Sequence, residues 1–231
     1  MIINWKKIEE HFPVLLLCLY LGEMLILAIS PYDRPTWWAE NLPVMMVVII
    51  LVITYRYFRF SNRSYFLMAL FLMYHTIGGH FTFEHTPFIW GNKLLAAVDG
   101  HFLFPEGRNN FDRLGHFLVG VFALPIAEFF YRRRLVVKWW AALLVGVLAI
   151  GFWAALYEII EMIYALQSGG EAGQLFLGAQ GDIWDAQKDM LLDILGALTT
   201  VLLFGFASKP RWTKKDKELL RKNGKRVLGQ Y

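Results

Sequence analysis

Hydrophobic residues run along this chain in long blocks rather than in the short alternating pattern of a half-buried β-strand. Six blocks are each about as long as the ~20-residue helix that crosses the hydrocarbon core of a bilayer. They cover about residues 12–30, 43–58, 65–83, 114–131, 139–164 and 190–207. The pattern predicts an all-α integral membrane protein, a bundle of about six transmembrane helices.

Composition agrees with this fold class. Of the 231 residues, 57% are hydrophobic and 18% are charged, whereas soluble domains are about a quarter charged. The single cysteine, Cys18, lies inside the first block, which excludes a disulfide framework and a cysteine metal motif. Glu23 interrupts the same block and no small-residue cleavage site follows, so we expect a retained helix rather than a signal peptide.

Basic residues alternate between the segments that connect the blocks, and their distribution predicts the orientation. With the N-terminus in the cytoplasm, 18 of the 23 Lys and Arg residues lie on the cytoplasmic side, so both termini are expected there. We divide the chain into one six-helix transmembrane domain, residues 1–207, and a basic cytoplasmic tail, residues 208–231. The tail is expected to lie on anionic lipid headgroups and not to bind nucleic acid.

Four aspartates enter the last block at helical spacing. Asp182, Asp185, Asp189 and Asp193 follow one another at steps of three, four and four, which places them on one helix face. The Gly-Asp step makes Asp182 a plausible helix N-cap, but capping does not account for the other three. Carboxylates at a membrane boundary are unfavourable unless they are hydrated, paired or metal-bound, so this row predicts a functional site.

Three other blocks carry polar pairs at the same predicted depth near the outer leaflet. The pairs are His80 with Glu84, Asp112 with His116, and Glu158 with Glu161, each at a spacing that shares a helix face. The first two pairs also have ordinary explanations, an interfacial helix end for His80 with Glu84 and, for Asp112, a favourable charge in a first helical turn. A simple surface explanation is weaker for Glu158 and Glu161, because apolar residues flank both. The two glutamates are like charges, so either one is protonated or a cation lies between them. Nearer the cytoplasm, Glu128 and Arg132 read as a structural ion pair.

The coincidence of four helices at one depth predicts a shared site. We expect a polar cavity lined by His116, Glu158, Asp185 and Asp189. The catalytic candidates are His116, His80 and Glu158; the substrate-binding candidates are Arg113, Trp184 and Gln180; the metal-ligand candidates are Glu84, Asp112, Glu161, Asp182, Asp185, Asp189 and Asp193. This oxygen-rich set favours a divalent cation such as Mg²⁺, Mn²⁺ or Ca²⁺ over a structural Zn²⁺.

The same residues resemble a known family. The segment from His75 to Phe88, the run Asp112-Arg113-x-Gly-His116-Phe, the pair Glu158-x-x-Glu161 and residues 176–190 are similar to the YjdF family of bacterial inner-membrane proteins. The resemblance covers nearly the whole chain apart from the basic tail. It implies a multi-pass protein of the bacterial plasma (inner) membrane.

A second, weaker resemblance is to VanZ-like membrane proteins. Their pattern pairs Asp-Lys-x-x-His with a closing Asp-x-x-x-Asn-x-x-Gly-Ala, and Asp112-Arg113-Leu-Gly-His116 and Asp189-x-x-x-Asp193-x-x-Gly-Ala occupy those places here. Asp193 stands where that pattern has Asn and adds an ionisable group. This resemblance implies an envelope-related role.

Three functions stay open at this stage. The first is a metal-assisted enzyme that acts on a lipid or lipid-linked envelope substrate; no Gly-x-Ser-x-Gly nucleophile motif or phosphate-binding loop occurs. The second is a proton- or cation-coupled transporter, which acids confined to one interface do not favour. The third is a non-catalytic protein whose polar network only joins the helices. The pattern leaves the oligomeric state open.

Overall fold

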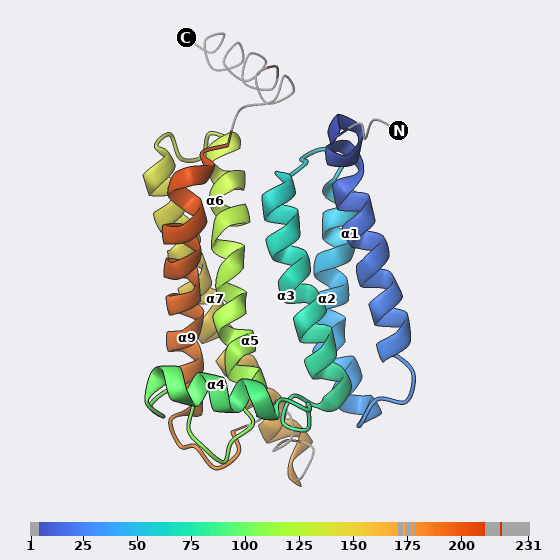
Figure 1. The fold of residues 1–231 in the computed structure, drawn as a ribbon, viewed down its shortest axis with the longest axis vertical. Coiled ribbons are helices and arrows are strands. Elements are labelled where there is room, and N and C mark those ends of the chain that lie inside the picture. The colour runs from blue at the N-terminus through green and yellow to red at the C-terminus, as the bar shows by residue number, and fades with distance from the viewer. Residues whose placement is uncertain (1–4, 171–172, 174–176, 178, 211–217, 219–231) are drawn as a thin grey trace.

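The computed structural model describes residues 5–170, 173, 177, 179–210 and 218, and in that part of the chain all regular secondary structure is helical. Long helices run side by side as a bundle (Figure 1). The first three are α1 (Trp5–Leu27), α2 (Arg34–Thr54) and α3 (Asn62–Phe81). A second group comprises α5 (Phe111–Val119), η1 (Gly120–Phe122) and α6 (Ala123–Arg132) as one rod, then α7 (Trp139–Ser168), then α9 (Asp185–Thr200) continued by η2 (Val201–Gly205) and η3 (Phe206–Ser208).

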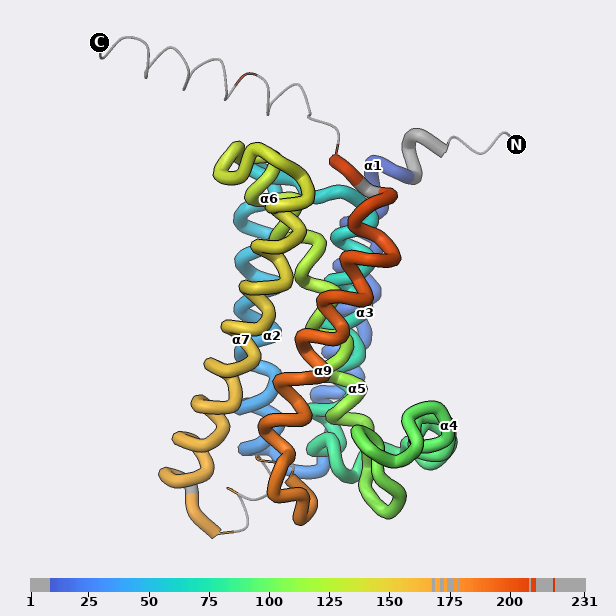
Figure 2. Tube along the Cα trace, turned by 90° about the vertical axis from the view of Figure 1, so that its left-hand side faces the viewer, coloured from blue at the N-terminus to red at the C-terminus, as the bar shows by residue number. Residues whose placement is uncertain are grey.

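Four helical segments are long and apolar enough to cross a membrane. They are Glu9–Leu27, Arg34–Thr54, Phe111–Arg132 and Trp139–Gln167. Helix α3 and the α9 rod run alongside these four (Figures 1 and 2). Large apolar side chains such as Leu25, Phe152 and Leu202 point outward, each at least 67% exposed, as expected for a lipid-facing surface.

The second helix begins earlier than its hydrophobic block. Asp33 caps it, because its Oδ1 accepts a hydrogen bond from the Thr36 amide at 2.8 Å, and Pro35 occupies the first turn. The expected start near residue 43 is therefore wrong. The early start places Glu40 and Asn41 inside α2, where both are buried.

A short helix, α4 (Ile89–Asp99), lies across the end of the bundle opposite the start of α1 (Figure 1). None of the six hydrophobic blocks covers this helix. The Asp99 carboxylate closes the helix by accepting hydrogen bonds from the amides of Leu103 and Phe104. Trp90 and Val98 on α4 are 83% and 79% exposed, so this helix presents an apolar face outward.

Two glycines bring the backbones of α9 and the α5–η1 rod into direct contact. A Cβ added at Gly120 would lie 2.1 Å from the Ala197 amide nitrogen, and one at Gly196 would lie 1.8 Å from the Phe117 carbonyl oxygen. Only glycine fits at such a crossing. The close approach positions the polar face of α9 against that of α5, one turn from the candidate site.

Candidate functional site

His116 joins the two helices that meet at the glycine contact. Its Nδ1 lies 3.1 Å from Asp193 Oδ2 on α9, and its Nε2 lies 3.8 Å from Asp112 Oδ1 one turn earlier on α5. His116 and Asp193 are 8% and 2% exposed. The predicted sharing of a helix face by Asp112 and His116 is confirmed, and Asp193 joins them from α9.

Asp112, His116 and Asp189 form a group with the dimensions of a metal site. Each offers one ligand atom, and these atoms lie within 4.8 Å of one another. Two buried oxygens beside them, Oδ1 of Asp189 and Oδ1 of Asp193, have no hydrogen-bond partner among the described residues. In an octahedral Mg²⁺ site with bonds of about 2.1 Å, adjacent ligands are about 3.0 Å apart and opposite ones about 4.2 Å, so these side chains would have to move inward to hold an ion. Two carboxylates and an imidazole suit such a cation.

Two buried arginines pair with the aspartates nearer the helix start. Arg113 is fully buried, and its Nη2 lies 2.6 Å from Asp182 Oδ2 and 2.9 Å from Asp185 Oδ1. Arg108 Nη2 lies 2.7 Å from the same Asp185 oxygen. Charge pairing of this kind satisfies Asp182 and Asp185 without a metal. Asp189 differs from these two, because its Oδ1 lies 3.8 Å from Arg113 Nε without a hydrogen bond, and Asp193 pairs with His116 instead.

Asp182 is held ionised by its neighbours. Burial acts to raise the pKa of its carboxyl group, but hydrogen bonds from Lys188 and Arg113 outweigh burial and place the pKa well below its usual range. Its other oxygen, Oδ1, accepts a hydrogen bond from the Trp184 amide at 3.0 Å. The predicted N-cap role of Asp182 is wrong, because α9 begins at Asp185 and its N-cap residue is Trp184. Asp182 instead accepts the hydrogen bond from the Trp184 amide in the turn before the helix, and it has two cationic partners in addition.

A polar cavity of about 70 Å³ lies beside His116. Asp112, Asp193 and Glu161 line it from three helices. Of the four lining residues expected from the sequence, only His116 is among the residues that border this cavity; Asp185 and Asp189 face Arg113 instead, at 2.9 and 3.8 Å. Glu158 lies one turn from Glu161, and its buried Oε1 has no hydrogen-bond partner among the described residues.

Three further polar residues line the cavity, and none was among the sequence candidates. His75 Nε2 lies 3.1 Å from the Glu40 carbonyl oxygen and 3.5 Å from Glu40 Oε2. Tyr157 Oη donates to the same Oε2 at 3.5 Å. The Asp33-Arg-Pro35 capping signal, which starts α2 early, would have placed Glu40 within the bundle. Arg108 lies in an irregular segment, where no periodic signal could have indicated its burial.

The expected pairing of His80 with Glu84 is wrong. Helix α3 ends at Phe81, because Thr82 and Phe83 adopt positive φ angles, so Glu84 is not on the helix. His80 Nδ1 lies 2.7 Å from the Leu27 carbonyl oxygen at the end of α1. Glu84 Oε1 lies 3.6 Å from His85 Nδ1. The structure places both candidates away from the cavity.

The three residues expected to bind substrate have different surroundings. Arg113 is enclosed by carboxylates, as described above, and is not open to a substrate. Gln180 exchanges two hydrogen bonds with the Asn109 backbone, at 2.9 and 3.1 Å, which joins the segment before α9 to the segment before α5. Trp184 is 60% exposed beside the start of α9. Of the three, Trp184 and Gln180 are exposed, and the Gln180 side chain is already hydrogen-bonded to the Asn109 backbone.

Comparisons with known proteins agree with the resemblance noted in the sequence. Residues 12–210 match the family described as predicted membrane protein (DUF2238). The chain is 35% identical over 176 residues to the inner membrane protein YjdF of Escherichia coli (strain K12), an alignment that covers 75% of this chain and 79% of that protein. No solved structure matches. The match confirms the predicted family.

Proposed function

The chain belongs to the DUF2238 family of membrane proteins, which includes inner membrane protein YjdF, and we propose that it crosses the plasma membrane six times with both termini in the cytoplasm. The described part of α1 begins, and η3 ends, at the same end of the bundle (Figure 2). The alternating distribution of Lys and Arg favours the cytoplasm for that end. The cavity beside His116 then faces the outer leaflet.

We further propose that the protein is a metal-assisted enzyme whose substrate is a lipid or a lipid-linked envelope compound. The convergence of Asp112, His116 and Asp189 within 4.8 Å carries this proposal. The two buried arginines pair closely with Asp182 and Asp185, whereas Arg113 approaches Asp189 only to 3.8 Å and Asp193 has His116 as its partner. With Glu161 nearby, the carboxylates of this group favour additional positive charge. A divalent cation would provide that charge.

The residues in and beside the cavity divide into metal ligands and groups that transfer protons. Asp112, His116 and Asp189 would hold the cation, and Asp193 orients His116 through its Nδ1. A bound cation would supply Lewis acidity, which makes water a better nucleophile and stabilises negative charge on a phosphoester or acyl group. We assign proton transfer to His75, whose Nε2 lies against Glu40.

The size of the cavity and the surface beside it favour a lipid-linked substrate. A space of about 70 Å³ holds an ion and a few water molecules but not a whole headgroup. Only the reacting bond of the substrate would therefore enter the cavity, while the apolar part of the substrate stays outside. Helix α4 and the start of α9 expose Trp90, Ile183 and Trp184 at this end, at 83%, 85% and 60%, and such side chains favour the membrane interface.

The deepest acid on the cytoplasmic side does not offer a relay for transport. Glu128 accepts hydrogen bonds from the Ser61 amide at 2.9 Å and the Ser64 hydroxyl at 2.6 Å, and its Oε1 lies 2.7 Å from Arg132 Nη1. The predicted Glu128–Arg132 ion pair is confirmed, and it also caps α3. A carboxylate held this way is poorly suited to carrying a proton, which favours the enzyme over a transporter.

Metal binding and hydrolysis test the proposal together. Purified protein should bind Mn²⁺, measured by electron paramagnetic resonance, and Asp189→Asn should reduce that binding by at least about tenfold, as loss of one ligand does. Glu106→Gln, an exposed matched control in the segment after α4, should bind as the wild type does.

Activity is measured as release of water-soluble product from phospholipid or lipid-linked phosphate in vesicles, with and without a chelator. Metal-dependent release that disappears in Asp189→Asn would support the enzyme. Equal Mn²⁺ binding in wild type and Asp189→Asn would overturn the assignment of this site. Binding of Mn²⁺ without hydrolysis would support the metal site and contradict the proposed enzymatic activity.

A further inference from the structure

A second cavity lies at the opposite end of the bundle from His116, between α1, α2 and α3. We propose that it binds a single anionic phospholipid of the inner leaflet, with one acyl chain in the cavity and the headgroup at the arginines beside its mouth. The assignment to the inner leaflet rests on the proposed topology, whereas the acyl-chain cavity itself does not. This site is separate from the cavity at His116 and shares no lining residue with it.

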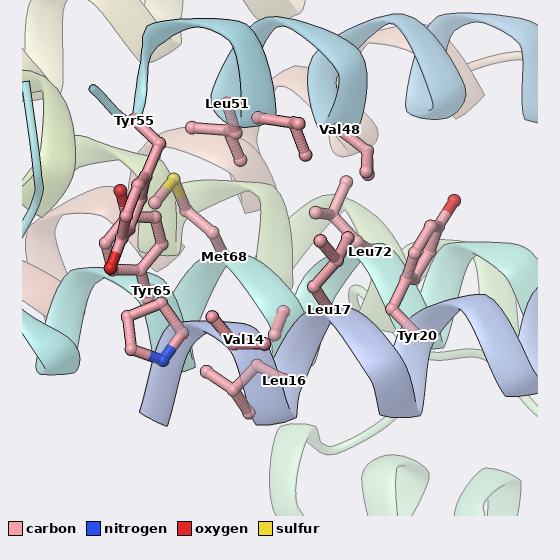
Figure 3. A pocket seen from close by; sticks show the side chains of 13 residues that line it. Val14, Leu16, Leu17, Tyr20, Val48, Leu51, Tyr55, Tyr65, Met68 and Leu72 are labelled. Carbon is pink, nitrogen blue, oxygen red and sulfur yellow. The ribbon is translucent and has the colours of Figure 1, made fainter. Parts of the chain in front are cut away.

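The cavity has a volume of about 180 Å³ and an apolar wall. Leu17 on α1, Leu51 on α2 and Met68 on α3 point into it from three sides (Figure 3). Tyr55 and Tyr65 lie together at one end and Tyr20 at the other, so the space is elongated along the bundle (Figure 3). An apolar, elongated space on a lipid-facing surface fits an acyl chain, because water would lose its hydrogen bonds there.

The arrangement of the three helices explains why this space exists. Toward the outer end, Tyr20 and Met24 of α1 pack with Trp37 and Val44 of α2 in a buried cluster. Toward the other end, α1 and α2 both continue against α3, and the cavity separates them there. Pro13 lies inside α1 at this level and lines the cavity. The opening therefore faces the lipid only in the half of the bundle that carries the basic residues.

Charge at the mouth determines which lipid fits. Arg59 lies over the ring of Tyr55, 5.7 Å from its centroid, and its Nη2 donates to the carbonyl oxygens of Glu9 and Glu10 at 3.1 and 2.9 Å. It thus joins α1 to the α2–α3 connection directly beside the cavity. Because Arg59 bonds to carbonyl oxygens, its charge is not paired with a carboxylate in these contacts.

Further basic residues surround the same connection. Arg56 lies over Tyr57 at 4.5 Å, Arg63 is exposed in the first turn of α3, and Arg133 lies 5.2 Å from the Phe58 ring centroid. Among the described residues, Glu9 and Glu10 carry carboxylates near these arginines, and the Glu128 carboxylate in the same region is paired with Arg132. The excess of arginine favours an anionic headgroup over a zwitterionic one.

The test uses the full chain, purified in mild detergent, stripped of lipid and titrated with phosphatidylglycerol or phosphatidylcholine while binding is followed by native mass spectrometry. We expect one tightly held phosphatidylglycerol. Ala69→Phe, which fills the cavity, should weaken binding by about tenfold, as when about two methylene groups of the chain can no longer be buried. Leu70→Phe, a neighbour that is 44% exposed and outside the cavity lining, is the matched control and should bind normally.

The headgroup is tested separately, with changes at exposed positions that should not affect folding. Arg56→Gln and Arg63→Gln should each weaken phosphatidylglycerol binding by about fivefold and leave phosphatidylcholine binding unchanged, the effect of one basic residue near an anionic surface. Equal binding of the two lipids by the wild type would overturn the anionic headgroup. Equal binding by wild type and Ala69→Phe would overturn the acyl-chain site. Neither result would affect the metal site, which the Mn²⁺ measurement tests independently.

Discussion

His116 Nδ1 lies 3.1 Å from Asp193 Oδ2, although 77 residues separate the two along the chain. Both side chains are buried between α5 and α9. Their contact depends on the backbone approach at Gly120 and Gly196 one turn away, where any side chain would collide with the opposite backbone. A histidine that one carboxylate orients and a second approaches is arranged for metal binding or proton transfer rather than only for packing.

The glycine crossing can be tested directly. Gly196→Ala places a methyl group about where the Phe117 carbonyl oxygen lies, so α9 must move away from α5. We expect a loss of about 1–3 kcal/mol in the free energy of unfolding, the usual effect of overpacking. Thermal and denaturant unfolding in detergent measure it. Gly22→Ala, whose Cβ would have no neighbour within 4 Å, is the control and should unfold like the wild type. Equal loss in both variants would contradict the close crossing.

Arg113 should be one of the most sensitive positions for stability. Arg113→Gln leaves Asp182 and Asp185 with less compensating charge in a buried place, which typically lowers the free energy of unfolding by about 3–5 kcal/mol. The double variant Arg113→Gln/Asp185→Asn removes one of the two carboxylates that lose their Arg113 partner, and it should be less destabilised than Arg113→Gln alone. A double-mutant cycle on unfolding measures the coupling between the two residues. Simple additivity would mean that they do not interact.

Acidification should reduce the stability that the ionised Asp182 contributes to the folded protein. Its pKa is lower in the folded protein than in the unfolded chain, so its stabilising effect is complete above the unfolded value of about 4 and decreases as the pH falls below it. The melting temperature of the wild type should therefore fall more steeply between about pH 4 and pH 2.5 than that of Asp182→Asn. Parallel curves for the two proteins would show that Lys188 and Arg113 do not hold this carboxylate ionised.

The topology predicts opposite results for reporters placed in different connections. Alkaline phosphatase fused after residue 100, next to α4, should be active because it folds outside the cytoplasm. A fluorescent protein fused after residue 135, between α6 and α7, should fluoresce because it folds in the cytoplasm. The reverse pair of results would invert the orientation and move the His116 cavity to the inner side.

Several features of the protein follow from local sequence alone. Long apolar blocks predict helices because a helix satisfies its own backbone hydrogen bonds in lipid. The Glu128–Arg132 and Asp112–His116 relationships follow from helical spacing, which depends only on residues one turn apart. The hydrogen bond from the Trp184 amide to Asp182 is likewise local, since it joins residues two positions apart. The match to a membrane protein family agrees with the same local pattern.

Only the tertiary structure decided how these helices share their polar groups. Asp185 and Asp189 are four residues apart and share a face of α9, yet of these two only Asp185 pairs with Arg108. Arg108 lies in an irregular segment, so no periodic pattern in the sequence could predict this contact. His80 bonds to the end of α1 because α3 stops at the positive φ of Thr82. Glu40 enters the cavity because α2 starts before its hydrophobic block. Helical spacing determines which residues share a face. The positions of the helix ends and the glycine crossing determine which groups of the neighbouring helices that face contacts.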